Sequence, residues 1–316
     1  MLLKNVVSID IGSSLIKMVQ LSQSSGKIRL EKVGVIDNPT SNLRTLGYKL
    51  RKNTIAQAIK HSLKKTKIKA RDAISSLGGS SIIIQYFKFP PLSGKELADA
   101  VCLEAQRVMG SKLNGMETDF QVLAQNQKKA EEEETLFVAV PKEMIQQRME
   151  TLQQSGLNPV AIDIDCLALA NCFLRLKNLT SQKRVMVLNL GTRLISLGIL
   201  GKDNLDLVRD INLDSKTPLD FREESTLEKV VGEVRRSIHY HESRARREKV
   251  TRVFLTGGGA VASETAELFL KALEIPGERW NPIEDLEFNP RKLGNEFKKS
   301  HGYLLAIAIG LALREK

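Results

Sequence analysis

Cysteines, aromatic residues and long apolar runs are all scarce in this chain of 316 residues. It has three cysteines, Cys102, Cys166 and Cys172, none of them in a C-x-x-C pair, and aromatic residues make up 5% of the chain. This cysteine usage favours a reduced, cytoplasmic protein without a structural zinc site. The longest apolar run, Tyr303 to Leu313, is too short to span a bilayer. Because Asp10 follows the first apolar residues at once, we expect no signal peptide.

What the chain does have is an ordinary globular composition with a large excess of positive charge. Hydrophobic residues make up 42% and charged residues 27%, and the length predicts two domains. The formal net charge is +11, much of it in two clusters, from Arg44 to Arg71 and from Arg235 to Arg252. Such clusters can face nucleic acid or an anionic membrane. Solvated helix faces are the favoured interpretation, because no base-stacking aromatics interleave the charges.

One pattern occurs twice in the chain. Residues 6–17 consist of an apolar β-rich run, the turn Gly12-Ser13-Ser14 and a second apolar run that ends at Lys17. Residues 185–200 repeat this plan at a shift of 179 positions, with Asn189 at the place of Asp10 and Gly191-Thr192 at the turn. Each copy predicts a strand, a tight turn and a strand. Glycine lets backbone N–H groups approach a ligand, and nearby hydroxyls and a lysine suit a phosphate. The sequence therefore predicts two half-molecules that grip a polyphosphate between them.

A third stretch, Arg252 to Ala260, is an apolar run that leads directly into Gly257-Gly258-Gly259. A helix is predicted to follow from about Ser263 to Leu273. A ligand can approach the bare backbone there, and a helix N-terminus favours anions. Three glycines alone are weak evidence, but their place after two phosphate-type hairpins adds weight to this interpretation.

The remaining patterns predict alternating strands and helices with a boundary between the halves at the polar connector 178–184. A helix is expected over about Thr54 to Lys65 with Asn53 as its N-cap, and a last helix over Tyr303 to Leu313. Asp163 and Asp165 have the spacing of a catalytic pair. We interpret Asp165 instead as the cap of the next helix.

With Asp10-x-Gly12-Ser13-x-x-x-Lys17, the second hairpin and Leu255 to Ala260, the chain resembles the actin-like ATPase superfamily. That superfamily includes actin, sugar kinases, heat-shock chaperone ATPases and the cell-division protein FtsA. Within it, the chain is similar to the cytoplasmic assembly proteins of type IV pili. Four further stretches carry this resemblance: Phe87–Leu92, Phe137–Glu143, Ser155–Asp163 and Ile307–Arg314.

The resemblance implies an α/β fold of two similar domains, each with a mixed five-stranded type of sheet and flanking helices, and nucleotide in the cleft between them. It places domain IA at 1–86 and 164–180, with an FtsA-type subdomain 1C at 87–163. Domain II would span 181–316, with a shortened subdomain IIB at about 213–250.

The resemblance also implies ATP and Mg²⁺ as ligands and a protein as partner. Asp10 would orient the water shell of the metal, so it is the expected metal residue. The other residues expected at the nucleotide would hold phosphate, offset its charge or pass under the adenosine: Gly12, Ser13, Ser14, Lys17, Asn189, Gly191, Thr192, Gly257, Gly258 and Gly259. A groove beside subdomain 1C would receive the cytoplasmic tail of an inner-membrane partner as an extended peptide.

The chain departs from the pattern of the superfamily in the second half of the cleft. Asn189 replaces the usual acid, and a neutral amide adds no negative charge for a hard cation. Asp214-Ser215-Lys216 replaces a Gly-Gly pair, and the segment between Asn212 and Leu227 is too short for the usual adenosine-contacting helices. Since hydrolysis needs a charged clamp on phosphate and metal, we expect weak or no ATPase activity.

The resemblance implies a scaffold of a type IV pilus or related secretion machine, cytoplasmic and held at the inner membrane through its partner. A homo-oligomer is also possible. A related subunit of type II secretion has a similar fold and is weighed beside the pilus protein, but it normally continues into a membrane helix. A functional ATPase or small-molecule kinase is the main alternative, although no general-base carboxylate stands out. A third alternative is a filament-forming, FtsA-like membrane protein, which would carry a terminal amphipathic helix.

Overall fold

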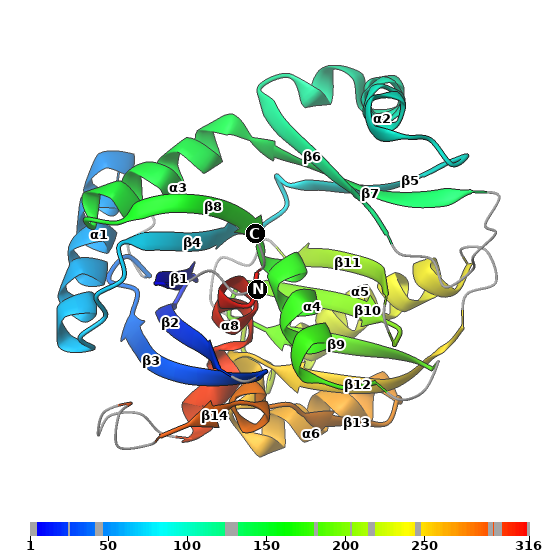
Figure 1. Cartoon of the computed structure of the whole chain (residues 1–316). Coiled ribbons are helices and arrows are strands. Elements are labelled where there is room, and N and C mark those ends of the chain that lie inside the picture. Colours follow the sequence, from blue (N-terminus) through cyan, green and yellow to red (C-terminus); the bar gives the residue numbers. More distant parts are fainter. Residues whose placement is uncertain are drawn as a thin grey trace.

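The computed structural model describes residues 5–24, 26–41, 47–123, 132–179, 183–202, 204–213, 219–243, 248–289, 293 and 299–314. Two large sheets lie on either side of a pair of buried helices, and a small third sheet stands at one end (Figure 1). No helix in the described part is long and apolar enough to cross a membrane.

The first sheet has six strands in the order β14-β3-β2-β1-β4-β8. An antiparallel meander is followed by two parallel strands, and a short sixth strand pairs with β3 at the far edge. The strands are β1 (Val6–Ile11), β2 (Leu15–Ser24), β3 (Lys27–Asp37), β4 (Asp72–Leu77), β8 (Asn158–Ile164) and β14 (Glu287–Phe288).

The second sheet follows the same path with five strands in the order β11-β10-β9-β12-β13. Its meander is antiparallel, and β12 and β13 are parallel to β9. The strands are β9 (Arg184–Leu190), β10 (Leu194–Leu200), β11 (Leu205–Asn212), β12 (Val250–Thr256) and β13 (Gly277–Arg279). The predicted repeat is thus a repeat of structure, and the prediction of two similar halves with mixed sheets is confirmed.

A third sheet, in the order β5-β7-β6, has a core of its own beneath helix α2. Its elements are β5 (Ile83–Phe89), α2 (Gly94–Met109), η1 (Gly110–Leu113), β6 (Met116–Val122) and β7 (Glu133–Pro141). It overlaps the predicted subdomain 87–163 but differs at both ends. Strand β5 begins at Ile83, and β8 joins the first sheet because it pairs in parallel with β4. The domain boundaries as such stay a prediction.

Two helices between the large sheets are exchanged between the halves. Helix α4 (Asp165–Leu176) follows β8 of the first sheet but packs mainly on β10 and β11 of the second. Helix α8 (Ala306–Ala312) comes from the second half and packs on β1, β2 and β4 of the first. The two helices cross at Gly310, where any Cβ would collide with the carbonyl oxygen of Ala168. Helix α8 also begins later than the helix predicted over Tyr303 to Leu313, because the 3-10 turn η4 (Lys299–Leu304) occupies its expected start.

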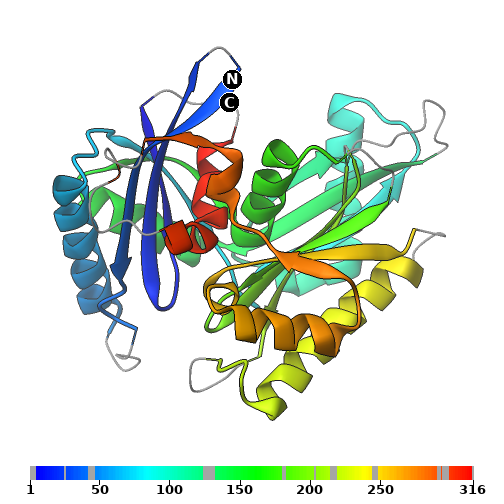
Figure 2. The same cartoon turned by 90° about the horizontal axis from the view of Figure 1, so that it is seen from below.

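The outer faces of the two sheets are covered by further helices. Helix α1 (Tyr48–Lys65) and helix α3 (Lys142–Gln154) lie outside the first sheet, and α5 (Glu224–Ser243) and α6 (Ser263–Leu273) outside the second (Figure 2). The prediction that Asn53 is the N-cap of α1 is wrong, because the helix begins earlier and its N-cap is Gly47. The extra turn is stabilised from α3, because Tyr48 Oη and Lys52 Nζ donate to Glu150 Oε2 at 2.9 and 2.8 Å.

Candidate functional site

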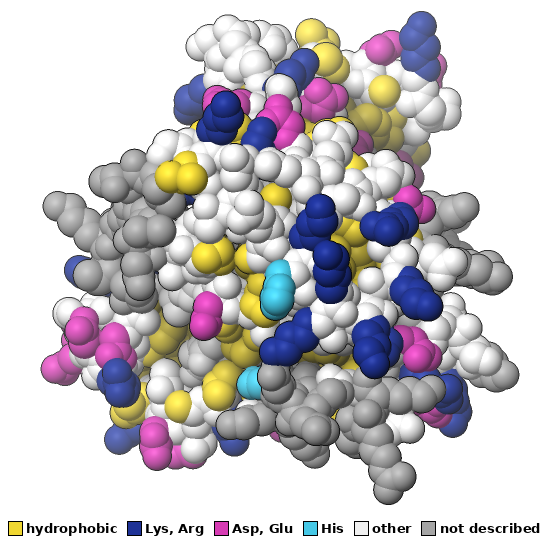
Figure 3. All heavy atoms as spheres, turned by 90° about the vertical axis from the view of Figure 1, so that its left-hand side faces the viewer, with side chains coloured by type: hydrophobic (Ala, Val, Ile, Leu, Met, Phe, Trp, Pro, Cys, Tyr) yellow, Lys and Arg dark blue, Asp and Glu magenta, His cyan; other side chains and the backbone are white. Residues whose placement is uncertain are grey.

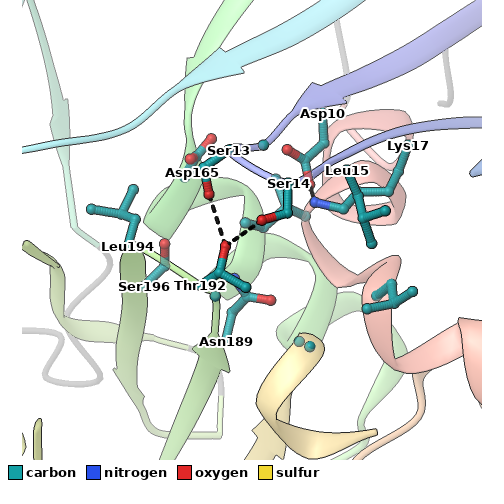
Figure 4. Close-up of a pocket in the computed structure, with 16 residues that line it drawn as sticks. Asp10, Ser13, Ser14, Leu15, Lys17, Asp165, Asn189, Thr192, Leu194 and Ser196 are labelled. Carbon is teal, nitrogen blue, oxygen red and sulfur yellow. Dashed lines mark hydrogen bonds and ion pairs between the residues drawn. The ribbon is translucent and has the colours of Figure 1, made fainter. Parts of the chain in front are cut away.

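The turns of the two repeated hairpins meet at the interface of the halves (Figure 4). The Ser13 and Ser14 hydroxyl oxygens lie 3.0 and 2.7 Å from Thr192 Oγ1. Both turns line one cavity of about 90 Å³, whose other walls come from the start of α4, the Gly257-Gly258 turn and α8. The structure thus brings the two predicted phosphate hairpins together at a single site.

The chain folds back closely at both turns, so that a side chain would be crowded at Gly12 and would collide at Gly191. A Cβ on Gly12 would lie 2.9 Å from Lys17 Nζ and 3.0 Å from the carbonyl oxygen of Leu15, and one on Gly191 would collide with the carbonyl oxygen of Leu194. The Gly12 N–H itself donates to Leu15 O at 2.9 Å. These glycines are explained by the tight turns themselves, whatever ligand the turns bind.

The predicted metal residue is paired with the predicted phosphate lysine. Asp10 is 3% exposed at the end of β1, and Lys17 Nζ on β2 donates to its Oδ2 at 2.8 Å. Both side chains line the cavity. A phosphate group entering the cavity would therefore compete with Asp10 for the ammonium group.

The Gly257-Gly258-Gly259 turn contributes only in part. Gly257, at φ +86°, and Gly258 line the cavity, and the Gly257 N–H donates to Tyr303 O at 2.7 Å. Gly259 in the 3-10 turn η2 (Gly258–Ala260) faces away from it, since its Cβ would lie 2.8 Å from Leu190 Cβ and 3.0 Å from the Phe221 ring. Gly259 is therefore a packing position, separate from the other predicted site residues.

Asp165 is the site residue that sequence reasoning missed, and its interpretation as a helix cap is wrong. It is the first residue of α4, after an Ile164 N-cap, and no cap hydrogen bond from that position is made. Its carboxylate lines the cavity and packs so close to Gly78 that a Cβ there would collide with it. Burial, and then the charge of Asp10, raise the pKa of Asp165 to about 6. A buried carboxyl group that titrates near neutrality is a candidate general base.

A second buried carboxyl group approaches Asp165 from the other half. Asp210 on β11 accepts a hydrogen bond at 3.3 Å from the backbone N–H of Gly79, which follows β4. Burial, and then the charge of Asp165, raise the pKa of Asp210 to about 7. Arg148 of α3 is half-buried and donates to Ser75 Oγ at 3.1 Å; desolvation lowers its pKa while the charges of Asp165 and Asp10 oppose that shift. A buried acid from the second half thus acts on Asp165, which itself lines the cavity.

The residues at the cavity fit a phosphate group and a hydrated metal ion. Three hydroxyl groups converge from the two turns and can turn toward phosphate oxygens. In the described part of the chain no group of three or more His, Cys, Asp or Glu side chains could enclose a metal ion. Mg²⁺ usually keeps several waters and binds through one or two carboxylates plus phosphates, which suits Asp10. Asn189 also lines the cavity, as a neutral neighbour.

A larger hollow, the α1–α3 groove, lies outside the first sheet between those two helices. It measures about 320 Å³, and its apolar residues are Ile11, Ile55, Leu77 and Met144. Tyr48, Arg51, Lys52, Gln147, Arg148 and Thr151 complete its lining. At its mouth, the carboxylate of Glu150 binds Lys52 and Tyr48. Desolvation, and then this hydrogen bond, raise the pKa of Tyr48 to about 12, whereas the hydrogen bond from Lys52 lowers the pKa of Glu150 to about 2.

Comparison with known proteins identifies a family and solved structures that this chain resembles. The family model "Type IV pilus assembly protein PilM" matches residues 8–216 and 224–316. Among solved structures, the chain is similar to one titled "PilM-PilN type IV pilus biogenesis complex", with a TM-score of 0.82 and 23% identity over 98% of both chains.

Two further structures are more distant. The cytoplasmic domain of EpsL, an inner membrane component of the type II secretion system of Vibrio cholerae, gives a TM-score of 0.50 at 10% identity over 98% of this chain and 95% of that one. The ethanolamine utilization protein EutJ from Carboxydothermus hydrogenoformans gives 0.50 at 13% identity over 97% and 88%. The fold is that of the actin-like ATPases, as expected from the hairpins.

Proposed function

Because the family model spans nearly its whole length, the chain belongs to the family of the type IV pilus assembly protein PilM, and we propose that it is a scaffold of a type IV pilus machine. In this proposal it is cytoplasmic and peripheral to the inner membrane, where it binds the cytoplasmic N-terminal peptide of a PilN-like inner-membrane protein. The observation that carries the proposal is the family match, supported by the similarity of the fold to that in the PilM–PilN complex.

The α1–α3 groove is the place we propose for the peptide. Its walls come from both the predicted domain IA, through Ile11 and Leu77, and the predicted subdomain 1C, through Met144. An apolar floor with a few convergent polar groups is typical of a binding site. Arg51, Lys52 and Gln147 at the lining offer donors for the carbonyl groups of an extended peptide.

Isothermal titration with a synthetic peptide from the N-terminus of the PilN-like protein tests this proposal. Met144→Lys would place a charge on the apolar floor, so we expect at least about tenfold weaker binding, the cost of roughly 1.4 kcal/mol. Met149→Lys is the matched control, because Met149 belongs to the same helix but lines a separate hollow beside Glu117 and Lys142. Equal binding by both variants would reject the groove, and no binding by the wild type would reject the partner.

For the cleft between the hairpins we propose binding of ATP with Mg²⁺ and weak or absent hydrolysis. Asp10 would face the metal-bound water. The phosphates would be held by the hydroxyl groups of Ser13, Ser14 and Thr192. Lys17 would leave Asp10 and bind phosphate instead. When bound, Mg²⁺ would neutralise phosphate charge. The second half of the cleft contributes Asn189 in place of an acid, which is the reason for expecting little hydrolysis.

A functional ATPase is the second candidate, and one observation favours it: Asp165 supplies a titratable carboxylate at the cavity. Steady-state assays of the wild type beside Asp10→Asn and Asp165→Asn separate the two. We expect the same background rate from all three, together with ATP binding that Asp10→Asn weakens. Turnover at ordinary enzyme rates that both substitutions abolish would establish the ATPase and overturn the weak-hydrolysis proposal.

A further inference from the structure

One of the two basic clusters carries positive charge without acids. The 34 residues from Asn38 to Arg71 contain ten Lys and Arg and no Asp or Glu. Arg44 lies outside the described residues; the other nine belong to α1 or to the segment that follows it. Lys and Arg side chains gather on this side of the molecule in Figure 3.

Helix α1 turns these charges outward. Its buried side consists of Ile55, Ala56, Ile59, Ser62 and Leu63, which face the sheet. Its exposed side, with the exposed cations after it, forms the basic face: Lys49, Lys60, Lys64, Lys65, Lys67, Lys69 and Arg71.

The basic face differs from the second cluster in how its charges are compensated. On and around α5, Arg235 pairs with Glu274, Arg236 with Glu233 and Arg252 with Glu278. Of the ion pairs recorded among the described residues, none involves Lys60, Lys64 or Lys69. Exposed cations that include these three lysines, in a segment without acids, produce a positive potential that suits a large anionic surface.

We propose that the basic face lies against anionic lipid headgroups of the membrane. Clustered lysines near a lipid surface each strengthen association, and the effect extends over a Debye length without specific contacts. At the start of the same helix Leu50, 55% exposed, can reach the apolar side of the interface.

Lipid fits this surface better than single-stranded nucleic acid does. Sequence-tolerant binding of single-stranded nucleic acid uses aromatic rings on which bases stack, and duplex DNA is the alternative that the experiment below tests. Tyr48 is the aromatic residue of α1, and its hydroxyl is bound to Glu150 while Lys52 lies over its ring at 5.2 Å. The α1–α3 groove also adjoins this helix, and the proposed function seats there a tail that emerges from a membrane. The inference rests on the proposed function in this respect only.

Vesicle flotation with the full chain tests the proposal. The probe is vesicles of 30% phosphatidylglycerol in phosphatidylcholine, beside pure phosphatidylcholine, at 50 and 500 mM salt. We expect binding to the anionic vesicles at low salt that is lost at high salt. Lys60→Glu/Lys64→Glu/Lys69→Glu should weaken it at least about 100-fold, since each lysine contributes about fivefold.

The matched control is Lys112→Glu/Lys202→Glu/Lys271→Glu, which changes net charge equally at exposed positions on other elements. It should bind at least ten times more tightly than the first variant. Equal loss in both variants, or binding to duplex DNA but not to vesicles, would overturn the proposal. Titration with the partner peptide separates the two proposals, because the basic-face variant should bind peptide like the wild type. If the chain binds vesicles but not the peptide, the proposed partner is rejected and the proposed lipid-binding surface is supported.

Discussion

Asp165, which lines the cleft cavity, and Asp210 of β11 are two buried carboxyl groups close enough for the charge of Asp165 to act on Asp210. Burial raises the pKa of Asp165 to about 6 and that of Asp210 to about 7, above the ordinary value of 3.8, with the charge of Asp10 adding to the first shift and the charge of Asp165 to the second. The folded protein therefore holds protons that the unfolded chain releases between about pH 4 and pH 7. By linkage, the pair lowers the free energy of unfolding as pH rises through this window, and the full penalty is present above about pH 7.

Asp210→Asn should relieve that penalty. We expect the variant to be more stable than the wild type at pH 8, by on the order of 2 kcal/mol, and nearly equal at pH 4.5. Urea unfolding followed by fluorescence of the single tryptophan, the buried Trp280, measures both values. Asp99→Asn, at an exposed position on α2, should show no such pH dependence. A loss of stability at pH 8 would show that the charged form is stabilised instead.

The hairpin residues could be predicted because their signal is local. Asp10, Gly12, Ser13 and Lys17 lie within one turn and two strands, so spacing alone brings them together. Asp165, Asp210 and Arg148 come from three separate elements, and their proximity depends on how α4, β11 and α3 pack. Asp165 is also a residue type that ordinarily begins helices, which is why the cap interpretation prevailed.

Among the elements, the crossing of α4 and α8 leaves no room for a side chain. Gly310→Ala should cost about 3 kcal/mol of stability, because the added methyl group meets the backbone of Ala168, which cannot rotate away. Trp280 reports on this region, since its ring lies 4.9 Å from that of Phe173 on α4. Denaturant unfolding of the two proteins gives the difference.

Gly232→Ala is the control for that substitution. Gly232 lies in α5 with nothing within 4 Å of a Cβ, so alanine should stabilise the helix by about 0.5–1 kcal/mol. If glycine-to-alanine lowers the free energy of unfolding at position 310 and raises it at position 232, the packing argument is supported. Stabilisation by Gly310→Ala would show that α4 and α8 can move apart.

The first turn of α1 depends on its neighbour rather than on its own sequence. Glu150→Gln should raise amide hydrogen exchange at residues 48–53 and change global stability by less than about 1 kcal/mol, because an ion pair at the protein surface contributes little. Glu143→Gln on the same helix, where Glu143 bonds Gln147, should leave that turn unchanged. Unaltered exchange in Glu150→Gln would mean that the turn is stable alone.

This dependence explains where element prediction succeeded and failed. The apolar spacing of Ile55, Ile59 and Leu63 predicted the body of α1, because these residues face the sheet. Its start could not be predicted, since the contacts to Glu150 come from a residue about a hundred positions away. The pairing of β14 with β3 had no local signal for the same reason.

For the whole molecule, the contact between Thr192 and the two serines joins the halves at the cleft. A disulfide in Ser13→Cys/Thr192→Cys, made with Cys102→Ser to remove an exposed thiol, should hold the two turns together. We expect the oxidised protein to lose ATP binding and to keep peptide binding in the α1–α3 groove, with reductant restoring the first. Titration calorimetry with each ligand measures this. Loss of both in the oxidised form would mean that the two sites are coupled.

The exchange of α4 and α8 has a consequence for how such a chain can be divided or assembled. If the chain were cut between α4 and β9, each fragment would retain a helix that belongs on the other fragment's sheet. Each would also lack the cover for its own sheet. Neither fragment should be stable alone, whereas co-expressed fragments should reconstitute the native assembly. A single half built on this plan would need a second copy of itself to supply the helix that covers the inner face of its sheet.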